Sequence, residues 1–191
     1  IIQAQIIETF LLNTVNLQTM IASKASRVAS AAGKKGVYDF SLRRTHGADA
    51  GIKVSRASYI AGFSGTSNVL AAKLYKIPVV GTMAHSFVMC FKQERDSFLA
   101  YADTFPERTT LLVDTYDTKK GIENAIIVGL YLKKKGYRLQ AIRLDSSDIV
   151  SLSRLARRML DKAGLGFVKI FASGNLDEFK IKNLLIREAR A

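Results

Sequence analysis

Short apolar segments alternate with longer amphipathic segments along most of this chain, and this alternation limits the folds it can adopt. Five apolar segments have the length and composition of buried strands: 37–42, 77–81, 110–113, 139–144 and 167–171. Apolar residues recur at helical spacing in the segments around them, which predicts helices over 3–32, 48–62, 67–75, 86–102, 122–135, 148–163 and 176–190. Repeated strand–helix units form parallel sheets with right-handed crossovers, so we predict an α/β fold. A closed parallel barrel has about eight strands, so we expect an open sheet or an incomplete part of a barrel.

The residues that follow the predicted strands are rich in side chains that bind anions, metals or sugars. In a parallel sheet the carboxyl ends of all strands lie on one side, where α/β proteins hold their ligands. We therefore expect one rim to collect the polar and aromatic residues at these ends: Phe40, Arg43, Arg44, His46, His85, Asp114, Asp117, Arg143, Asp145, Asp148, Ser173 and Asn175. His46 and His85 are the only histidines of the chain, so few side chains can act as an imidazole acid, base or nucleophile near neutral pH.

This mixture of side chains suits a phosphorylated sugar. Arg43 and Arg143 can each hold phosphate oxygens through two hydrogen bonds. Asp114 and Asp145 can accept hydrogen bonds from ribose hydroxyls, or hold a magnesium ion through water. Phe40 offers a flat apolar face to an aromatic ring.

Each of these residues also has a structural alternative. A single histidine on a loop is more often a hydrogen-bonded scaffold residue than a catalyst. Asp117 and Asp148 are placed to cap the helices that follow them, and Arg44 can simply pair with a carboxylate. Because the ends of several strands carry polar side chains, the set as a whole favours an active site.

Composition narrows the classes of protein further. The 191 residues are 48% hydrophobic, enough for one domain with a real core. The single cysteine, Cys90, cannot form an intramolecular disulfide and favours a reducing compartment. The net charge of +13 suits a polyanionic partner, but the basic residues are scattered in a way typical of solvated helix faces. The sequence has no structural zinc spacing, nucleophile elbow, phosphate loop or dinucleotide fingerprint, and no apolar run that could span a bilayer.

Five motifs occur in order along the chain. They are Asp39–Gly47 (DFSLRRTHG), Gly62–Asn68 (GFSGTSN), Gly81–Ser86 (GTMAHS), Leu112–Asp117 (LVDTYD) and Arg143–Ser146 (RLDS). Together they resemble the nicotinate phosphoribosyltransferase family, and the resemblance covers nearly the whole chain from about Thr9 onward.

The resemblance implies a reaction and a fold. Family members join nicotinate to phosphoribosyl pyrophosphate, which gives nicotinate mononucleotide and pyrophosphate in NAD biosynthesis, and ATP hydrolysis drives the reaction forward. The implied fold is the type II phosphoribosyltransferase α/β barrel beside a smaller domain, incomplete in this chain. By resemblance we expect ATP and Mg²⁺ as cofactors, a cytoplasmic homodimer with shared active sites, and neither a nucleic-acid nor a membrane partner. No residue is assigned as a metal ligand.

The resemblance also implies roles for individual residues. His85 is expected to be phosphorylated by ATP, Arg43 to contact phosphate, and Phe40 to stack on the pyridine ring. Arg143 and Asp145 are expected to bind the substrate carboxylate or amide region and the ribose. The expected catalytic residues are His85, Arg43 and Asp145, and the expected substrate-binding residues are Phe40, Arg43, Arg44, Ser67, Asp114, Arg143, Asp145, Ser173 and Asn175.

Two departures from the family pattern give further expectations. Ser147 stands where the family commonly has glycine, so a positive φ at this position would cost stability. The chain also lacks the family's later Gly-x-Gly-Thr loop, so we expect a core fragment that is inactive or weakly active in isolation. Residues 1–36 are predicted to be a helical segment leading to a missing N-terminal domain, and residues 37–191 a partial barrel.

Three alternatives remain open at this point. A quinolinate phosphoribosyltransferase is disfavoured, because such enzymes do not use a phosphohistidine. A nicotinamide phosphoribosyltransferase is harder to exclude from a fragment. A basic nucleic-acid-binding or scaffold domain without activity is the alternative from a different class, and salt-dependent binding to random duplex DNA would support it.

Overall fold

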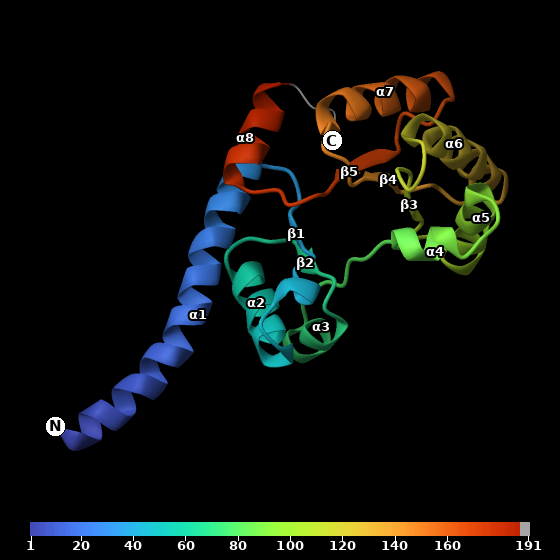
Figure 1. The fold of residues 1–191 in the computed structure, drawn as a ribbon. Helices are drawn as coiled ribbons and strands as arrows, with labels where there is room; N and C mark the ends of the chain where they lie inside the picture. Colours follow the sequence, from blue (N-terminus) through green and yellow to red (C-terminus); the bar gives the residue numbers. More distant parts are fainter. Residues whose placement is uncertain (188–191) are drawn as a thin grey trace. The chain divides into compact units, whose positions relative to one another are not determined.

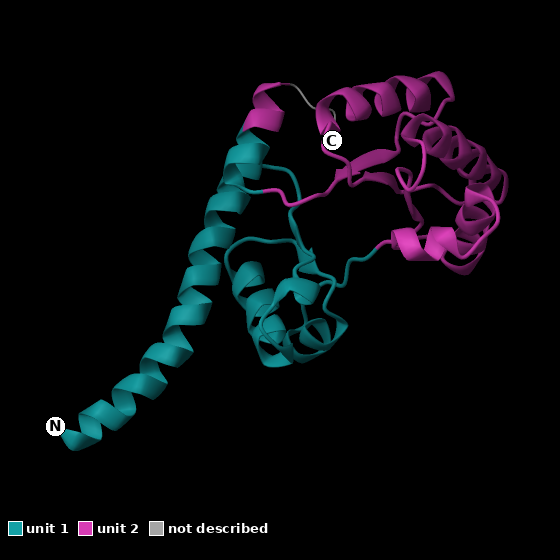
Figure 2. Cartoon of the chain, viewed as in Figure 1, with its two compact units in different colours: residues 1–81, 177–182 teal, residues 82–176, 183–191 magenta. Residues whose placement is uncertain are grey.

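A computed structural model describes residues 1–187 and divides the chain into two compact units (Figure 2). The first unit comprises residues 1–81 and 177–182, and the second comprises residues 82–176 and the described residues from 183 onward. The boundary between the two units lies near Gly81. The division of the chain predicted after residue 36 has a different basis, and it stays a prediction. No helix of residues 1–187 combines the length and the apolar character needed to cross a membrane.

The first unit is mainly helical, with one small parallel sheet (Figure 1). Its elements are α1 (Ile2–Ala32), β1 (Tyr38–Asp39), the 3₁₀ turn η1 (Leu42–Arg44), α2 (Ala48–Ile60), β2 (Gly65–Thr66) and α3 (Val69–Tyr75). Strand β1 pairs with β2, with Tyr38 opposite Gly65. Helix α2 packs against α1, α3 and β2. The side chain of Asn68 accepts a hydrogen bond from the Ala71 amide and so caps α3, as the sequence predicts.

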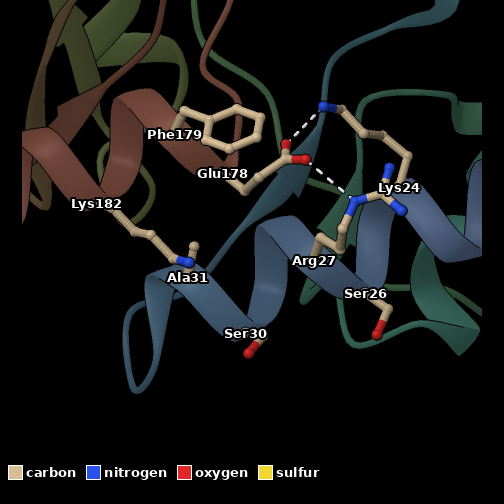
Figure 3. Close-up of a pocket in the computed structure, with 8 residues that line it drawn as sticks. All are labelled: Lys24, Ser26, Arg27, Ser30, Ala31, Glu178, Phe179 and Lys182. Atoms are coloured by element: carbon tan, nitrogen blue, oxygen red, sulfur yellow. Dashed lines mark hydrogen bonds and ion pairs between the residues drawn. The ribbon is translucent and has the colours of Figure 1, made fainter.

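Helix α1 meets the first residues of α8 (Glu178–Ile186) through a buried carboxylate (Figure 3). Lys24 Nζ lies 2.5 Å from Glu178 Oε2, and Arg27 Nε lies 3.1 Å from Glu178 Oε1. A cavity of about 660 Å³ opens beside this cluster, and Lys182 and Phe179 also line it. Hydrogen bonds from Lys24, from a backbone amide and from Arg27 lower the pKa of Glu178 to about 2. The two cations therefore hold this carboxylate ionised.

The lowered pKa of Glu178 predicts a pH-dependent contribution to stability. Because the folded pKa lies below the ordinary value of 4.5, this contribution is complete above pH 4.5 and is lost as pH falls towards about 2. We expect Glu178→Gln to lower the free energy of unfolding at pH 7, and the difference from wild type to shrink between pH 4.5 and 2. Urea titrations followed by circular dichroism measure this. Lys182→Gln removes a charge from the same cavity and is the control; a Glu178→Gln deficit independent of pH would contradict the assignment.

The second unit is an α/β structure built on three parallel strands (Figure 1). Its elements are α4 (His85–Met89), α5 (Glu94–Thr104), β3 (Thr110–Leu112), α6 (Thr118–Lys134), β4 (Ala141–Leu144), α7 (Ile149–Lys162) and β5 (Lys169–Ala172). The strand order is β3-β4-β5, with Leu112 opposite Arg143 and Arg143 opposite Phe171. This register aligns the carboxyl ends of the three strands.

The core of the second unit lies where helices pack against this sheet. It includes fully buried side chains from the strands and from α5, α6 and α7: Leu111, Leu112, Ile142, Leu144, Phe98, Ile122, Val128, Leu132 and Leu160. Strands of a parallel sheet carry continuous apolar runs when both faces are covered. Helix α6 comes so close to β3 that a Cβ on Gly121 would fall on the Val113 carbonyl, so only glycine fits at this crossing.

The predicted elements are confirmed in type for most of the chain, but two predictions are wrong in detail. The helix predicted over 86–102 is two helices, because α4 ends at Met89 and α5 begins at Glu94, where acidic residues favour a helix start. The strand predicted over 77–81 contributes a single bridge from Val79 to Thr66, since Pro78 has no amide to donate to a ladder.

The described strands also form two separate parallel sheets instead of the one sheet that the sequence predicts. The final helix is predicted over 176–190 and is observed over Glu178–Ile186, and residues 188–190 of the prediction lie outside the described residues.

Candidate active site

Four of the predicted site residues meet at the carboxyl ends of β3, β4 and β5. Asp114 follows β3, Arg143 lies in β4, Asp145 follows β4, and Ser173 follows β5. The parallel register explains their proximity, because it brings the ends of strands far apart in sequence to one edge. The rim predicted from the sequence is therefore present for these three strands.

Arg143 is the centre of this rim. Its guanidinium donates from Nε to Ser173 Oγ at 2.8 Å and from Nη1 to Thr82 Oγ1 at 2.8 Å. Its Nη2 lies 3.3 Å from Asp145 Oδ2, and its side chain is only 13% exposed. Ser173 Oγ also donates to Asp145 Oδ1 at 2.7 Å. A planar guanidinium whose three nitrogens all contact neighbouring side chains has a fixed orientation. The positive charge of Arg143 is therefore held in one position at this rim.

His85 lies beside the same carboxylate. It is the first residue of α4, and its Nε2 is 3.6 Å from Asp145 Oδ2. Its Nδ1 is 3.1 Å from Thr115 Oγ1 on the loop after β3. The side chain is 42% exposed, so the imidazole is oriented by neighbours yet open to a ligand.

Asp114 ties two of the loops together and keeps one oxygen unused. Its Oδ2 accepts hydrogen bonds from the Asp145 amide at 2.5 Å and from Ser146 Oγ at 2.6 Å. Its Oδ1 is buried and has no hydrogen-bond partner among the described residues. Mg²⁺ binds through one or two carboxylates together with substrate phosphates and water, and an orphaned carboxylate oxygen at this rim fits that requirement. No group of three or more histidine, cysteine or acidic side chains within residues 1–187 could hold a metal ion by itself.

The loop after β5 has two consecutive residues with a positive φ. Gly174 has φ +111°, and the next residue, Asn175, has φ +49°. A Cβ on Gly174 would lie 3.3 Å from the Asp145 carbonyl oxygen, so this glycine allows the β5 loop to approach the β4 loop. Ser147 does not have a positive φ, because Lys76 and Asn175 are the non-glycine residues with one in the described chain. The serine at position 147 therefore carries no left-handed strain.

The other predicted site residues lie in the first unit, around β1. Asp39 is 5% exposed, and its carboxylate accepts four hydrogen bonds. These come from the Ser41 amide at 2.9 Å, Ser41 Oγ at 2.5 Å, Ser55 Oγ at 2.8 Å and Thr66 Oγ1 at 2.9 Å. Asp39 thus fixes the start of the loop after β1, a role that the sequence analysis missed.

This loop carries the predicted ligand-binding side chains of the first unit. Phe40 is half-buried, while Arg43 and Arg44 are exposed on η1. Ser67 donates from its amide and its Oγ to the Asp39 carbonyl oxygen, at 2.9 and 3.2 Å. Ser67 therefore hydrogen-bonds to the β1 backbone in this structure. The side chains of Arg43 and Arg44 are exposed to solvent.

Glu94 is a further buried acid that the sequence analysis missed. It is 9% exposed, and its Oε2 accepts a hydrogen bond from Asn124 at 2.9 Å, while its Oε1 has no partner among the described residues. Burial raises its pKa, with smaller contributions from Asp117 and Asp114. It lines a cavity of about 400 Å³ with Tyr116 and Asp117. Asp117 and Asp148 cap α6 and α7, so their structural alternative is confirmed.

The model of the nicotinate phosphoribosyltransferase (NAPRTase) family matches residues 36–181. The chain belongs to this family. It is 52% identical over 185 residues to a nicotinate phosphoribosyltransferase of Mycobacterium tuberculosis, covering 97% of this chain and 40% of the relative. It is 47% identical over 193 residues to the Bacillus subtilis nicotinate phosphoribosyltransferase, covering 100% of this chain and 39% of the relative.

Solved structures agree with the family assignment. Human nicotinic acid phosphoribosyltransferase matches with a TM-score of 0.91 and 30% identity, over 98% of this chain and 49% of that chain. A nicotinate-nucleotide pyrophosphorylase of Pyrococcus furiosus matches with a TM-score of 0.78 and 32% identity, over 91% of this chain and 45% of that chain. The chain thus spans less than half the length of these relatives. The α/β class predicted from the sequence is confirmed.

Proposed function

We propose that this chain supplies part of the active site of a nicotinate phosphoribosyltransferase, which forms nicotinate mononucleotide and pyrophosphate from nicotinate and phosphoribosyl pyrophosphate. One observation carries the proposal: His85, Arg143 and Asp145 are joined at the carboxyl edge of a parallel sheet. An oriented guanidinium, a carboxylate and an accessible imidazole are the groups that a carboxylated ring, a ribose and a phosphoryl donor require. Membership of the family supports this choice of reaction.

The transfer itself needs positioning and charge. The ring nitrogen of nicotinate forms a bond to the anomeric carbon while the bond from that carbon to pyrophosphate breaks, through a transition state with oxocarbenium character. Such a step is accelerated by orienting the two partners and by cations placed at the leaving group. In the second unit, Arg143 would hold the nicotinate carboxylate. By the family resemblance, Phe40 is expected to stack on a pyridine ring, and Arg43 and Arg44 to bind phosphate. Asp145 would hold the ribose, and Ser67, Ser173 and Asn175 would be further substrate contacts.

His85 would couple the reaction to ATP. An imidazole nitrogen forms a bond to the γ-phosphorus while the bond from that phosphorus to the bridging oxygen breaks, which releases ADP and leaves a phosphohistidine. Hydrolysis of that phosphohistidine would drive the cycle forward. Bound Mg²⁺ would neutralise phosphate charge, and Asp114 Oδ1 together with Asp145 would hold it. The whole protein would be a cytoplasmic homodimer, with this chain forming part of an α/β barrel.

Pyrophosphate release by the full-length protein tests the proposal. We expect release that depends on nicotinate and phosphoribosyl pyrophosphate and that ATP stimulates. His85→Gln should lose the ATP-dependent increment and the acid-labile phosphate on the protein, because the acceptor nitrogen is gone. The control is His46→Gln, which removes the other histidine of this chain and should keep both. Release with quinolinate or nicotinamide but not nicotinate would replace the substrate assignment, and no release with any of the three would overturn the proposal.

A further inference from the structure

Thr82 contacts the guanidinium at the centre of the rim from a segment far away in sequence. Its Oγ1 accepts a hydrogen bond of 2.8 Å from Arg143 Nη1, across 61 residues of the chain, and both residues belong to the second unit. We propose that Thr82 is a positioning residue, whose hydroxyl aims the Arg143 guanidinium at the carboxylate of the substrate. This inference rests on the proposed function in one respect, namely that Arg143 holds that carboxylate.

The chemistry of the two groups fixes the direction of this hydrogen bond. A guanidinium has only N–H donors and no acceptor, so the Thr82 oxygen must accept from it. The hydroxyl proton of Thr82 points elsewhere, because Oγ1 donates to the Met83 carbonyl oxygen at 3.1 Å. The lone pairs of the oxygen therefore face Arg143. A methyl group at the same place could not accept, and Nη1 would lose this partner.

Ser173 repeats this arrangement at a second nitrogen of the same group. Its Oγ accepts from Arg143 Nε at 2.8 Å, while its proton can reach Asp145 Oδ1 at 2.7 Å or the Leu144 carbonyl oxygen at 3.3 Å. The two hydroxyls come from opposite ends of the second unit in sequence and hold Nη1 and Nε of one planar group. Because the guanidinium is planar and rigid, restraint at both nitrogens limits the tilt of its plane.

The position of the Thr82 hydroxyl is set by the fold and does not depend on Arg143. The next residue, Met83, is 4% exposed and packs in the core of the second unit with Val88 and Phe98. A buried neighbour anchors the backbone at Thr82, and a β-branched side chain has restricted χ1 freedom. The hydroxyl can therefore act as a fixed point against which the longer and more flexible arginine side chain is held.

The orientation of Arg143 matters for a carboxylate in particular. Arginine binds a carboxylate best through two parallel N–H···O bonds, and this geometry requires the two planar groups to be aligned. A tilt of the guanidinium would weaken both bonds together, although the charge of Arg143 would remain. Loss of Thr82 should therefore weaken the binding of nicotinate and leave the binding of phosphoribosyl pyrophosphate at other residues unchanged.

Steady-state kinetics of the full-length protein test this expectation with three variants of Thr82. Thr82→Val keeps the shape and removes the hydroxyl, and KM for nicotinate should rise roughly tenfold, the effect of one hydrogen bond to a charged group. Its kcat, and its KM for phosphoribosyl pyrophosphate, should stay within about twofold of wild type, because uniform binding of one substrate is lost. Thr82→Ala should give the same pattern with a smaller side chain, and Thr82→Ser should restore a KM within about threefold of wild type.

Thr109→Val is the matched control. Thr109 is buried at the amino end of β3, and its Oγ1 donates to the Phe105 carbonyl oxygen at 2.7 Å. Its replacement removes a hydroxyl from the same unit without touching the rim, so both KM values should stay at the wild-type level. A nicotinate KM within about threefold of wild type in Thr82→Val and Thr82→Ala would overturn the inference. An equal rise in KM for phosphoribosyl pyrophosphate would show a general distortion and would overturn it too.

Failure of this inference is distinguishable from failure of the proposed function. If wild type does not use nicotinate, the proposed function fails, whatever the role of Thr82. Crystal structures of the full-length wild type and of Thr82→Val then still decide that role. The Arg143 side chain should be displaced or present in more than one conformation in Thr82→Val. An Arg143 side chain in the same single position in both structures would overturn the positioning role.

Discussion

Replacing Arg143 with methionine should lower kcat/KM for nicotinate about a thousandfold in the full-length protein, a change of about 4 kcal/mol in transition-state stabilisation. Arg143 is 13% exposed and joins Ser173, Thr82 and Asp145 at the rim. Methionine would leave Asp145 without its partner cation and would remove the group proposed to hold the substrate carboxylate. Loss of one member of a buried charged pair costs roughly 2–5 kcal/mol.

Two further variants test this expectation, one at Arg143 and one control at Arg138. Arg143→Lys keeps the charge but cannot reproduce the planar fork, so it should recover only a small part of the activity. Arg138→Met is the matched control, because Arg138 precedes the same strand at its opposite end and lies over the Phe167 ring. Steady-state kinetics with nicotinate as the varied substrate measure all three. An Arg143→Met enzyme within tenfold of wild type, or an equal loss in Arg138→Met, would show that Arg143 does not bind the substrate.

The residues at the carboxyl ends of β3, β4 and β5 were predictable from the sequence. The side chains that hydrogen-bond to them were not. Arg143, Asp145 and Ser173 follow or end apolar runs, and parallel pairing alone brings such positions to one edge. Thr82 and Thr115 carry no comparable signal, because a threonine near a strand end is common and its partner is set by side-chain direction. His85 was identified from its place after an apolar run. Its two neighbours, on loops 30 and 60 residues later in the chain, became visible only in the folded arrangement.

Local chemistry also explains where the predicted elements differ from the observed ones. The segment from His85 to Thr104 has an apolar pattern that suits one helix, yet Glu94 and Asp96 start a second one. The spacing of apolar residues does not reveal such a break. Acidic residues do indicate it, because they favour the first turn of a helix. At β2, local preference argues against the observed strand, because Gly65 is a poor strand former. A Cβ at this position, however, would lie 2.6 Å from the Pro78 carbonyl oxygen. The close approach of the neighbouring segment selects glycine, and only the tertiary fold reveals that approach.

Replacing Asp39 with alanine should lower the free energy of unfolding by about 3 kcal/mol, since several buried donors would lose their acceptor. The network is specific to this fold: Ser55 and Thr66, which donate to Asp39 Oδ2, are 16 and 27 residues away in sequence. Some donors can form other bonds, because Ser55 Oγ also lies 3.0 Å from the Gly51 carbonyl. The loss should therefore be smaller than the sum of four independent hydrogen bonds.

Matched variants separate the network from simple packing. Ser41→Ala removes a single side-chain donor and should cost about 1 kcal/mol. Asp39→Asn keeps the volume but turns an amide group towards hydroxyl donors, so it should fall between alanine and wild type. Urea unfolding followed by circular dichroism gives the free energies. Because the same carboxylate holds the Ser41 amide at the start of the loop that carries Arg43, Asp39→Asn should also weaken binding of phosphoribosyl pyrophosphate in the full-length protein. An Asp39→Ala protein within 1 kcal/mol of wild type would show that the loop is held by its backbone contacts instead of by this carboxylate.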